Sequence, residues 1–569
     1  MTCGRKFGNT VVGVSILVIV GSIILLLFFP SMYRNGLEKE STLIENTNFY
    51  DLWKDLPFPV YQKFYFFNIT NKDRFIEGFD EYLKYEEVGP YTYMSIWKKK
   101  NLTFENDTVS YREVKTYYFD QYRSNGTEND VIYSLSISYA TATNMVRLKP
   151  GFLQRLIDTN FHFLGQQLII KRTVSELTFK GYFDKILYTT QTFLKTPYHD
   201  SVFAWFYHRN DTDEGIFTVG TGKHDNSQVN KIKKWNGKTK LDYWASDTCN
   251  SLDGTNAEVG PLLTDNQTNY TFFQPLACRV LTFEYEGEQL IYHGLKAKRF
   301  QNTRRLFGNV KENPDNYCYV TDRNLPSGVL DISSCQFNAP VYLSFPHFYL
   351  ADSSYLDNVN GLQPVEDLHK SYIDVNLETG VTVELAIRMQ VNLRIHQNKY
   401  FSDLENVPSG IYPVFWVETG AEFGEELSYF IKRKIEDPLK IGYGVLGACL
   451  IAGLLSAIGG FVLLRNKNRM WQERQPLMDN KNNITYSTYV PRMDPVAGPS
   501  TGRLPLSIEV SHDNSQEEII TSTTSELYSK KIAFDSSGKV DSTKTESPRI
   551  PTRKLDSPAQ IILDQKRGL

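Results

Sequence analysis

The chain has 569 residues, of which 41% are hydrophobic and 22% charged, enough for one large folded region or several of ordinary size. Its 62 Lys and Arg residues nearly balance 65 Asp and Glu residues, which leaves a formal net charge of −3. No overall positive field would attract a polyanion, so we expect no nucleic-acid partner. Aromatic residues make up 14% of the chain, a content typical of half-buried strands, and they predict a β-rich body.

Two apolar segments without a charged residue, 11–29 and 441–464, lie towards the two ends of the chain. Even the shorter one would extend about 28 Å as a helix, close to the thickness of the hydrocarbon core of a bilayer. The first segment exceeds the usual length of a signal-peptide core, and no small-residue cleavage site follows it. We therefore expect two membrane-spanning helices, the first of them an uncleaved anchor.

Basic residues stand at the outer end of each apolar segment, at Lys6 and from Arg465 onward. Because Lys and Arg resist export, both termini are predicted to be cytosolic. The tail is rich in Ser and Thr and has no sustained apolar periodicity, so we expect it to be disordered. The predicted organisation is a short cytosolic N-terminus (1–10), a first transmembrane helix (11–29), a lumenal or extracellular ectodomain (30–440), a second transmembrane helix (441–464) and a cytosolic tail (465–569).

N-glycosylation sequons favour the same topology. Asn483 heads the single sequon in the tail, where glycosylation is not expected. All the others fall between the two apolar segments, on the side predicted to be exported. The predicted N-glycosylation sites are Asn68, Asn101, Asn106, Asn125, Asn210, Asn266 and Asn269.

The exported region also holds Cys249, Cys278, Cys318 and Cys335. An even number of cysteines in an oxidising compartment predicts two disulfides. Four cysteines allow three pairings, and the spacing of the residues leaves all three open.

The ectodomain is predicted to be mainly β. Runs of β-branched and aromatic residues, alternating or nearly continuous, are typical of strands. The clearest runs are residues 60–68, 109–119, 215–219 and 381–395. No internal repeat and no Pro/Gly-rich linker divides the region, so we expect one domain.

Between about residues 150 and 194 the periodicity becomes helical. Apolar residues from Phe152 to Leu168 recur at helical spacing,. Thr173 and Glu176 then have the spacing of a capping box, which predicts the start of a further helix. We expect a helical insertion on the β body.

Sequence motifs of catalytic chemistry are missing. The sequence has no HExxH or CxxC pattern and no pair of histidines four residues apart, so we predict no metal site. It has no GxSxG motif, and residues 220–223 lack the spacing of a phosphate-binding loop. We expect a protein that is not an enzyme and has no cofactor. A membrane-anchored ectoenzyme is the disfavoured alternative.

A series of runs follows the ectodomain from end to end. By first residue, they are Glu87 (EVGPYTY), Gly222 (GKHD), Gly237 (GKTKLDYW), Asn256 (NA), Glu312 (ENPDNYC), Gly328 (GVLDISSC), Ala339 (APVYLSFPHF), Gln390 (QVNL) and Glu418 (ETG). In this order, and together with the terminal spans, the chain resembles the class B scavenger receptors over about residues 1–465. This is the family of fatty-acid translocase and of lysosomal integral membrane protein type II.

The resemblance implies an α+β fold. Its parts are a large antiparallel β-barrel-like ectodomain, a helical apex bundle at about residues 150–194, an apolar tunnel and the two transmembrane helices. In this family the tunnel is the proposed route of lipids, such as fatty acids, sterols or phospholipids, towards the membrane. A methylene group gains about 0.8 kcal/mol on leaving water, so an apolar bore would favour lipid over open solvent.

The resemblance also pairs Cys249 with Cys318 and Cys278 with Cys335. Several family members have a further cysteine just after the NPDNYC motif. Val320 stands at that place here, so the additional bridge of those members is absent.

The helical insertion coincides with the membrane-distal apex, where the family binds protein ligands. Some members cluster lysines at the apex, whereas this chain has a mostly apolar run followed by Lys171 and Arg172. The resemblance therefore implies a lumenal protein ligand at the apex and argues against anionic lipoproteins.

The tail has a predicted sorting signal close to the membrane. Glu473, Leu477 and Met478 have the spacing of an acidic dileucine signal and resemble the tail of the lysosomal family member. Clathrin-adaptor-type sorting machinery is therefore a predicted partner. Cys3, beside the first span, is a candidate palmitoylation site.

Small residues recur every four positions along the second span. Such a stripe lets helix backbones approach closely, which predicts pairing with the first span or with another copy of the chain in a homo-oligomer. The residues are Gly444, Ala448, Ala452, Ser456 and Gly460.

These observations favour a lysosomal or late-endosomal membrane protein that passes lipid through its ectodomain and escorts a lumenal protein. The alternative is a plasma-membrane scavenger or phagocytic receptor of the same fold, which takes up lipoprotein or cell-debris ligands.

Overall fold

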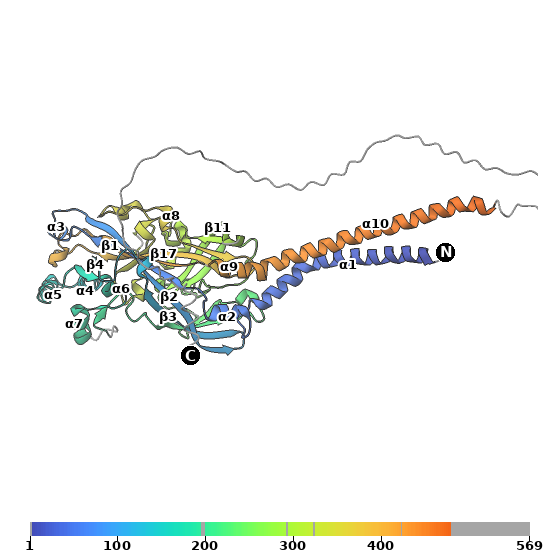
Figure 1. Ribbon diagram of the computed structural model, residues 1–569. Helices are drawn as coiled ribbons and strands as arrows, with labels where there is room; N and C mark the ends of the chain where they lie inside the picture. The colour runs from blue at the N-terminus through green and yellow to red at the C-terminus, as the bar shows by residue number, and fades with distance from the viewer. Residues whose placement is uncertain (1–2, 195–199, 292–293, 323–324, 423, 480–569) are drawn as a thin grey trace, which may run out of the picture. The chain divides into compact units, whose positions relative to one another are not determined.

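The computed structural model describes residues 3–194, 200–291, 294–322, 325–422 and 424–479. All of these residues belong to one compact unit, Met1–Ile484. Within it, most strands join a single 14-stranded sheet (Figure 1). The runs of aromatic and β-branched residues thus form the β body that they predict.

The main path of the sheet is antiparallel between neighbours and follows the order β10-β11-β12-β16-β17-β18-β1-β2-β3-β8-β9. β13 pairs with β14, β14 pairs with β17, and β15 pairs in parallel with β2. Two separate pairs, β4 with β5 and β6 with β7, lie outside this sheet. The strands are β1 Val60–Ile69, β2 Leu83–Glu105, β3 Thr108–Phe119, β4 Val131–Leu135, β5 Ile169–Thr173, β6 Tyr182–Phe183, β7 Val202–Phe203, β8 Thr212–Gly220, β9 Ile232–Trp235, β10 Asn269–Gln274, β11 Arg279–Ile291, β12 Leu295–Gln301, β13 Leu330–Asp331, β14 Val341–Ser344, β15 Val359–Asn360, β16 Tyr372–Asn376, β17 Thr382–Ile395 and β18 Gly410–Glu422.

The two edges of the path, β9 and β10, are bridged by one short segment. The Ile232 amide of β9 donates to the Gly254 carbonyl at 2.9 Å, and the Phe273 amide of β10 donates to the Thr255 carbonyl at 2.8 Å. The sheet is therefore a nearly closed barrel, as the resemblance implies. The four runs predicted as strands correspond to β1, β3, β8 and β17.

The interior of the barrel is packed with aromatic rings. Phe64 of β1 lies 5.0 Å from Phe206 and 6.2 Å from Phe415, measured between ring centroids. All three side chains are buried. This packing accounts for the high Phe and Tyr content, since large rings fill the space between curved strands.

The helices are α1 Cys3–Glu40, α2 Asn48–Lys54, α3 Lys72–Ile76, α4 Ile137–Val146, α5 Gly151–Phe163, α6 Val174–Thr178, α7 Lys185–Leu194, α8 Glu366–His369, α9 Glu425–Ile431 and α10 Asp437–Asp479. α1 and α10 contain the two apolar segments. Each is long and apolar enough to cross a membrane, and little of either span is buried within the protein. A π-helical turn, Lys432–Glu436, connects α9 to α10.

α10 continues past the predicted boundary at Leu464 and ends at Asp479. Helix therefore replaces the predicted disorder over residues 465–479. Many of these residues are Arg, Lys, Gln and Met, which favour helix, and extending an existing helix requires no new nucleus. The predicted tail from residue 480 onward lies outside the described residues.

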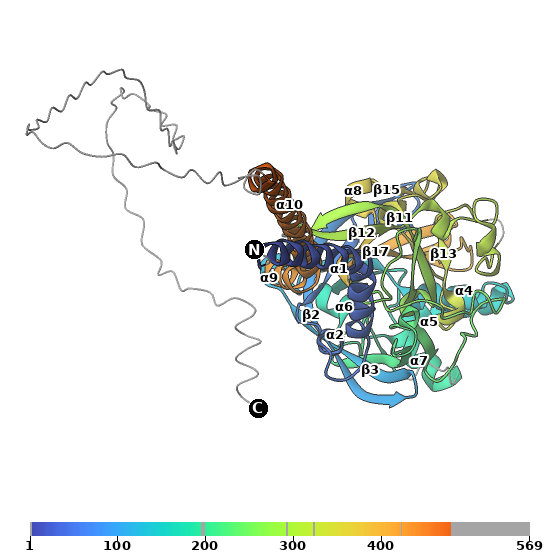
Figure 2. The ribbon, with the colours of Figure 1, turned by 90° about the vertical axis from the view of Figure 1, so that its right-hand side faces the viewer.

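α1 and α10 pack against each other (Figures 1 and 2). The hydroxyl oxygens of Ser15 and Ser456 lie 2.9 Å apart. Gly453 and Gly460 approach α1 so closely that a methyl group at either position would collide with its side chains, whereas Gly444 has open space around it. Ser456 and Gly460 of the predicted stripe therefore meet α1, and pairing with another copy stays a prediction.

The predicted helical insertion is a mixture of helix and strand. α5 and α7 lie within it, and the predicted capping box of Thr173 and Glu176 is present at the start of α6. Between α5 and α6, however, β5 pairs with β4, which precedes the insertion. α4, Ile137–Val146, also precedes the predicted start at about residue 150 and packs near α7. The periodicity signal missed α4 because much of its buried face is polar or small, including Ser138, Ala140 and Thr143.

Two disulfides join Cys249 to Cys318 and Cys278 to Cys335, the pairing that the resemblance implies. They close loops of 69 and 57 residues. On the chain-entropy model each contributes about 4 kcal/mol by restricting the unfolded chain.

Candidate functional site

α5 and α9 lie at opposite ends of the long strand β17. Ile431 of α9 belongs to the same buried cluster as Val383, near the start of this strand. Gln154 of α5 instead accepts a hydrogen bond of 2.7 Å from Asn398, just past its end. Fourteen residues of strand span about 46 Å,. Figure 1 shows α4, α5 and α7 together at this end of the barrel, remote from α9 and the membrane-spanning helices.

The inward face of α5 carries two polar side chains. Gln154 and Asp158 are 2% and 7% exposed. The Gln154 amide nitrogen donates to the Lys149 carbonyl at 2.7 Å, and Asp158 Oδ1 accepts hydrogen bonds of 3.2 Å from the amide and the hydroxyl of Ser402. These bonds satisfy the buried polar groups, and they fix which face of α5 turns inward.

Three large apolar side chains lie on the outward face of α5, together with the exposed Thr159. Phe152, Leu156 and Phe163 have exposed fractions of 76%, 57% and 88%. Residues four and eleven positions apart lie within about 40° of one another around a helix, so these side chains form one continuous stripe. We call Phe152, Leu156 and Phe163 the apical stripe. Exposed apolar patches are typical of surfaces that bind another molecule.

Basic residues border the apical stripe. Arg147, Lys149 and Arg155 are exposed, whereas Asp158, the acid of α5, is buried. Leu148, between two of the basic residues, is 84% exposed. The surface therefore suits a partner with an apolar patch and an acidic border, because complementary charge steers and orients association.

A second group of functional side chains is a buried histidine pair that the sequence analysis missed. His347 and His369 stack with ring centroids 4.3 Å apart and are 6% and 3% exposed. His347 Nε2 lies 2.6 Å from Glu87 Oε2, which also accepts a 2.7 Å hydrogen bond from the Trp416 indole. Burial opposes ionisation of Glu87, yet these hydrogen bonds outweigh it and lower the pKa of its carboxyl.

Backbone amides occupy one nitrogen of each ring. The Gln363 amide donates to His347 Nδ1 at 3.0 Å, and the Val365 amide donates to His369 Nδ1 at 2.8 Å. Each Nδ1 therefore acts as an acceptor, which leaves Nε2 as the donor of each ring. The sequence run that contains His347 resembles the family. The distance in sequence between His347 and His369 matches no motif, so the sequence does not predict that the two rings stack.

Lys99 forms the centre of a buried ionic cluster in the barrel. Its ammonium lies 2.9 Å from Glu113 and 2.5 Å from Glu258, and all three side chains are at most 8% exposed. Burial and the neighbouring Glu113 raise the pKa of Glu258 to about 8, so this acid keeps its proton at neutral pH. Glu258 Oε1 is buried and has no hydrogen-bond partner when both acids are ionised. A proton on Glu258 removes this deficit, because the protonated acid donates a hydrogen bond to Glu113.

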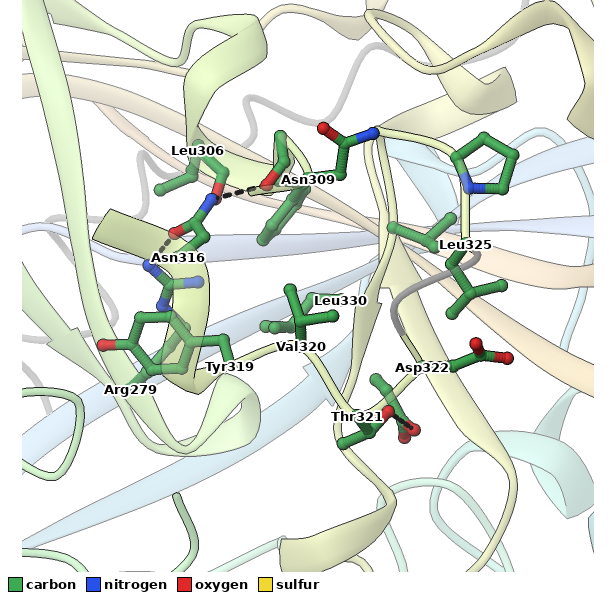
Figure 3. Close-up of a pocket in the computed structure, with 15 residues that line it drawn as sticks. Arg279, Leu306, Asn309, Asn316, Tyr319, Val320, Thr321, Asp322, Leu325 and Leu330 are labelled. Atoms are coloured by element: carbon green, nitrogen blue, oxygen red, sulfur yellow. Dashed lines mark hydrogen bonds between the residues drawn. The ribbon is translucent and has the colours of Figure 1, made fainter. Parts of the chain in front are cut away.

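Two small cavities are outlined by the described residues. One has a volume of about 30 Å³ and another about 20 Å³, room for a few water molecules. Figure 3 shows the larger cavity, beside Arg279. The apolar tunnel therefore stays a prediction.

The predicted glycosylation sites all lie on the ectodomain. Asn68 is partly buried and accepts a 2.9 Å hydrogen bond from the Tyr133 amide through Oδ1, which leaves Nδ2 as the atom for a glycan. The other sites, Asn101, Asn106, Asn125, Asn210, Asn266 and Asn269, are exposed.

The sites predicted to be cytosolic lie on the two long helices. Cys3 is the first residue of α1, and Glu473, Leu477 and Met478 belong to the last turns of α10. Their roles in palmitoylation and sorting stay predictions. Within the part of the chain that the structure describes, no group of three or more His, Cys, Asp or Glu side chains is placed to hold a metal ion.

Comparisons with known proteins agree with the architecture. The model of the CD36 family matches residues 11–464. Scavenger receptor class B member 1 of Bos taurus is 33% identical over 433 residues, covering 76% of this chain and 84% of the relative. Lysosome membrane protein 2 of Homo sapiens is 32% identical over 463 residues, covering 79% of this chain and 94% of the relative. The matched region includes both membrane-spanning segments, the whole barrel and the apical helices, and the chain therefore belongs to the CD36 family, the class B scavenger receptors.

Proposed function

We propose that this protein is a lipid receptor of the lysosomal or late-endosomal membrane that also escorts a lumenal protein. The observation that carries the escort role is the apical stripe, where three large apolar side chains face solvent while polar side chains of the same helix are buried. Their exposure to water is unfavourable in free energy, and a bound partner that covered them would remove this penalty. The stripe lies far from α10, where a partner would be clear of the bilayer.

A binding experiment on the apical stripe tests the escort role. Phe152→Ser with Leu156→Ser removes two exposed side chains without opening a cavity, so folding is expected to persist. We expect co-purification of lumenal proteins with the full-length chain to fall at least tenfold. The matched control is Phe79→Ser, an exposed Phe outside the stripe (70% exposed). Equal recovery with the stripe variant and the wild type would contradict the proposal.

Lipid transfer rests on the family and on the nearly closed, aromatic-lined barrel. The proposed cargo is a fatty acid, a sterol or a phospholipid, and the bilayer is its destination. Lipid extraction and native mass spectrometry of the glycosylated ectodomain, residues 35–440, identify the cargo. Stoichiometric lipid of one class is the expected result, and a lipid-free ectodomain would refute transfer through its interior.

The lysosomal location rests on Glu473, Leu477 and Met478 and on the similarity to lysosome membrane protein 2. Leu477→Ala with Met478→Ala should redirect the chain to the cell surface if adaptor proteins read this signal. Unchanged surface abundance would favour the second candidate, a plasma-membrane scavenger or phagocytic receptor. That candidate is favoured by the similarity to scavenger receptor class B member 1.

A further inference from the structure

Arg279, the first residue of β11, is a buried cation without a counter-ion. Only 6% of it is exposed, and none of the ion pairs among the described residues includes it. Burial lowers the pKa of its guanidinium to about 10, so the side chain remains charged at neutral and acidic pH. Removing a charge from water costs several kcal/mol unless another charge compensates it.

The contacts of Arg279 satisfy its guanidinium only in part. Nε donates to the Val280 carbonyl at 3.2 Å, and Nη2 donates to Asn316 Oδ1 at 3.4 Å. The guanidinium also lies over the ring of Tyr319, 3.5 Å from its centroid. Nη1 is buried and has no hydrogen-bond partner. A neutral amide, a carbonyl and a ring face supply no full negative charge.

A cavity lies beside this guanidinium (Figure 3). Its volume is about 30 Å³, whereas one water needs about 10–15 Å³ measured with a water-sized probe. The cavity thus has room for a group larger than one water. Apolar residues form much of its wall, among them Leu306, Val320 and Leu330, which weakens screening and strengthens attraction to a charge.

Two acidic residues that also line the cavity, Asp322 and Asp331, interact with other partners. Asp331 accepts hydrogen bonds from Thr321, from Tyr342 and from the Ser333 amide. Asp322 forms an ion pair of 3.1 Å with Arg394. Neither carboxylate is paired with Arg279, and each is already compensated by its own donors.

We propose that this cavity binds a monovalent anion, either a halide ion or the carboxylate of an organic acid, on Nη1 of Arg279. The bound anion completes the hydrogen bonding of the guanidinium and compensates its charge. It also links the start of β11 to residues 319–322. These two segments follow Cys278 and Cys318, one cysteine of each disulfide, so a bound anion stabilises the contact between them. Anion binding here does not depend on the lipid or escort roles proposed above.

Bromide is the direct probe. Crystals of the full-length wild-type chain are soaked in sodium bromide, with sodium isethionate as the bulky reference anion at equal ionic strength. An anomalous peak within hydrogen-bonding distance of Nη1 is the expected result. Water in the cavity without a bromide peak would overturn the proposal. Because the crystals contain the wild-type chain, this result does not depend on the folding of a variant.

Thermal unfolding supplies the second measurement. Bromide should raise the midpoint of the wild type saturably over the reference salt. Arg279→Lys should weaken the apparent affinity at least tenfold, because Lys lacks the second terminal nitrogen of the fork. Arg112→Gln, at a partly exposed Arg paired with Asp213, is the matched control and should respond as the wild type does. An equal shift in Arg279→Lys would mark adventitious salt effects and overturn the site.

Competition distinguishes the two sources of anion. Sodium acetate or sodium octanoate that displaces bromide identifies a carboxylate site, and an unaffected bromide peak identifies a halide site. Either result supports an anion at Arg279.

Discussion

His369 should cost the folded state stability as the pH falls. Its ring is 3% exposed and accepts a hydrogen bond from the Val365 amide. Burial, the neighbouring His347 and Arg388 lower its pKa to about 4, against the weaker opposite effect of Glu87. A proton on Nδ1 would turn this acceptor into a donor facing another donor. The folded state therefore holds the imidazole neutral, whereas the unfolded chain takes up a proton near pH 6.5.

The sign follows from proton binding. Between pH 6.5 and about 4 the unfolded state binds more protons, so the free energy of unfolding falls as the pH falls. The full difference corresponds to about 3.4 kcal/mol, of which about 2 kcal/mol would be lost at pH 5. Solvent screening around the partly exposed Glu87 reduces this figure. We expect His369 to contribute a loss of about 1 to 2 kcal/mol between pH 7.5 and pH 5.

His369→Asn isolates this contribution. The Asn side-chain oxygen replaces Nδ1 as the acceptor for Val365 but does not titrate. Urea unfolding of the full-length chain at pH 7.5 and pH 5 should show a smaller acid loss in the variant, by about 1 to 2 kcal/mol. Hydrogen exchange at the Val365 amide should accelerate at pH 5, relative to the intrinsic rate, in the wild type only.

His208→Asn is the matched control, since the His208 side chain is 71% exposed. It should keep the full acid loss of the wild type. The reasoning is refuted if His369→Asn and the wild type lose the same stability between pH 7.5 and pH 5.

Three further predictions concern the barrel, the membrane helices and the disulfides. Glu258→Gln should be more stable than the wild type at pH 7.5 and approach it at pH 5, because the neutral amide needs no proton on folding whereas the wild-type acid takes one up; urea unfolding at pH 7.5 and pH 5 measures the difference. Gly460→Leu should separate α10 from α1. Cysteines introduced at Ser15 and Ser456 should then no longer form a cross-link, whereas Gly444→Leu should leave this cross-link intact. Cys278→Ser should lower the free energy of unfolding by about 2–5 kcal/mol, and unchanged urea unfolding would contradict the entropic account.

The sequence predicts the barrel well because its signal is local. In β1, alternate residues face the packed interior, and the burial pattern follows that alternation over most of the strand. The two membrane-spanning helices are equally clear, since an uncharged apolar run of bilayer length has few other stable forms. The end of α10 is less predictable, because helix propagation beyond Leu464 depends on weak preferences of each residue.

The candidate site is much harder to predict from the sequence. Helical spacing of Phe152 and Leu156 correctly predicts α5, but ordinary amphipathic logic would bury these side chains. The structure reverses that expectation, because Gln154 finds Asn398 and Asp158 finds Ser402, partners more than 200 residues away in the chain. Such long-range hydrogen bonds leave no trace in periodicity. The pairing of His347 with His369 is invisible for the same reason.

Two buried groups respond to acid in opposite directions, and their contributions to the free energy of unfolding partly cancel. The contribution of His369 lowers the free energy of unfolding as the pH falls from 6.5 towards 4. Glu258, with its pKa raised to about 8, binds its proton more tightly in the folded state and adds stability as the pH falls from 8 towards 4.5. Because both windows include pH 5, the two contributions oppose each other there. A chain that carries both groups is therefore less sensitive to acid than either group alone would make it.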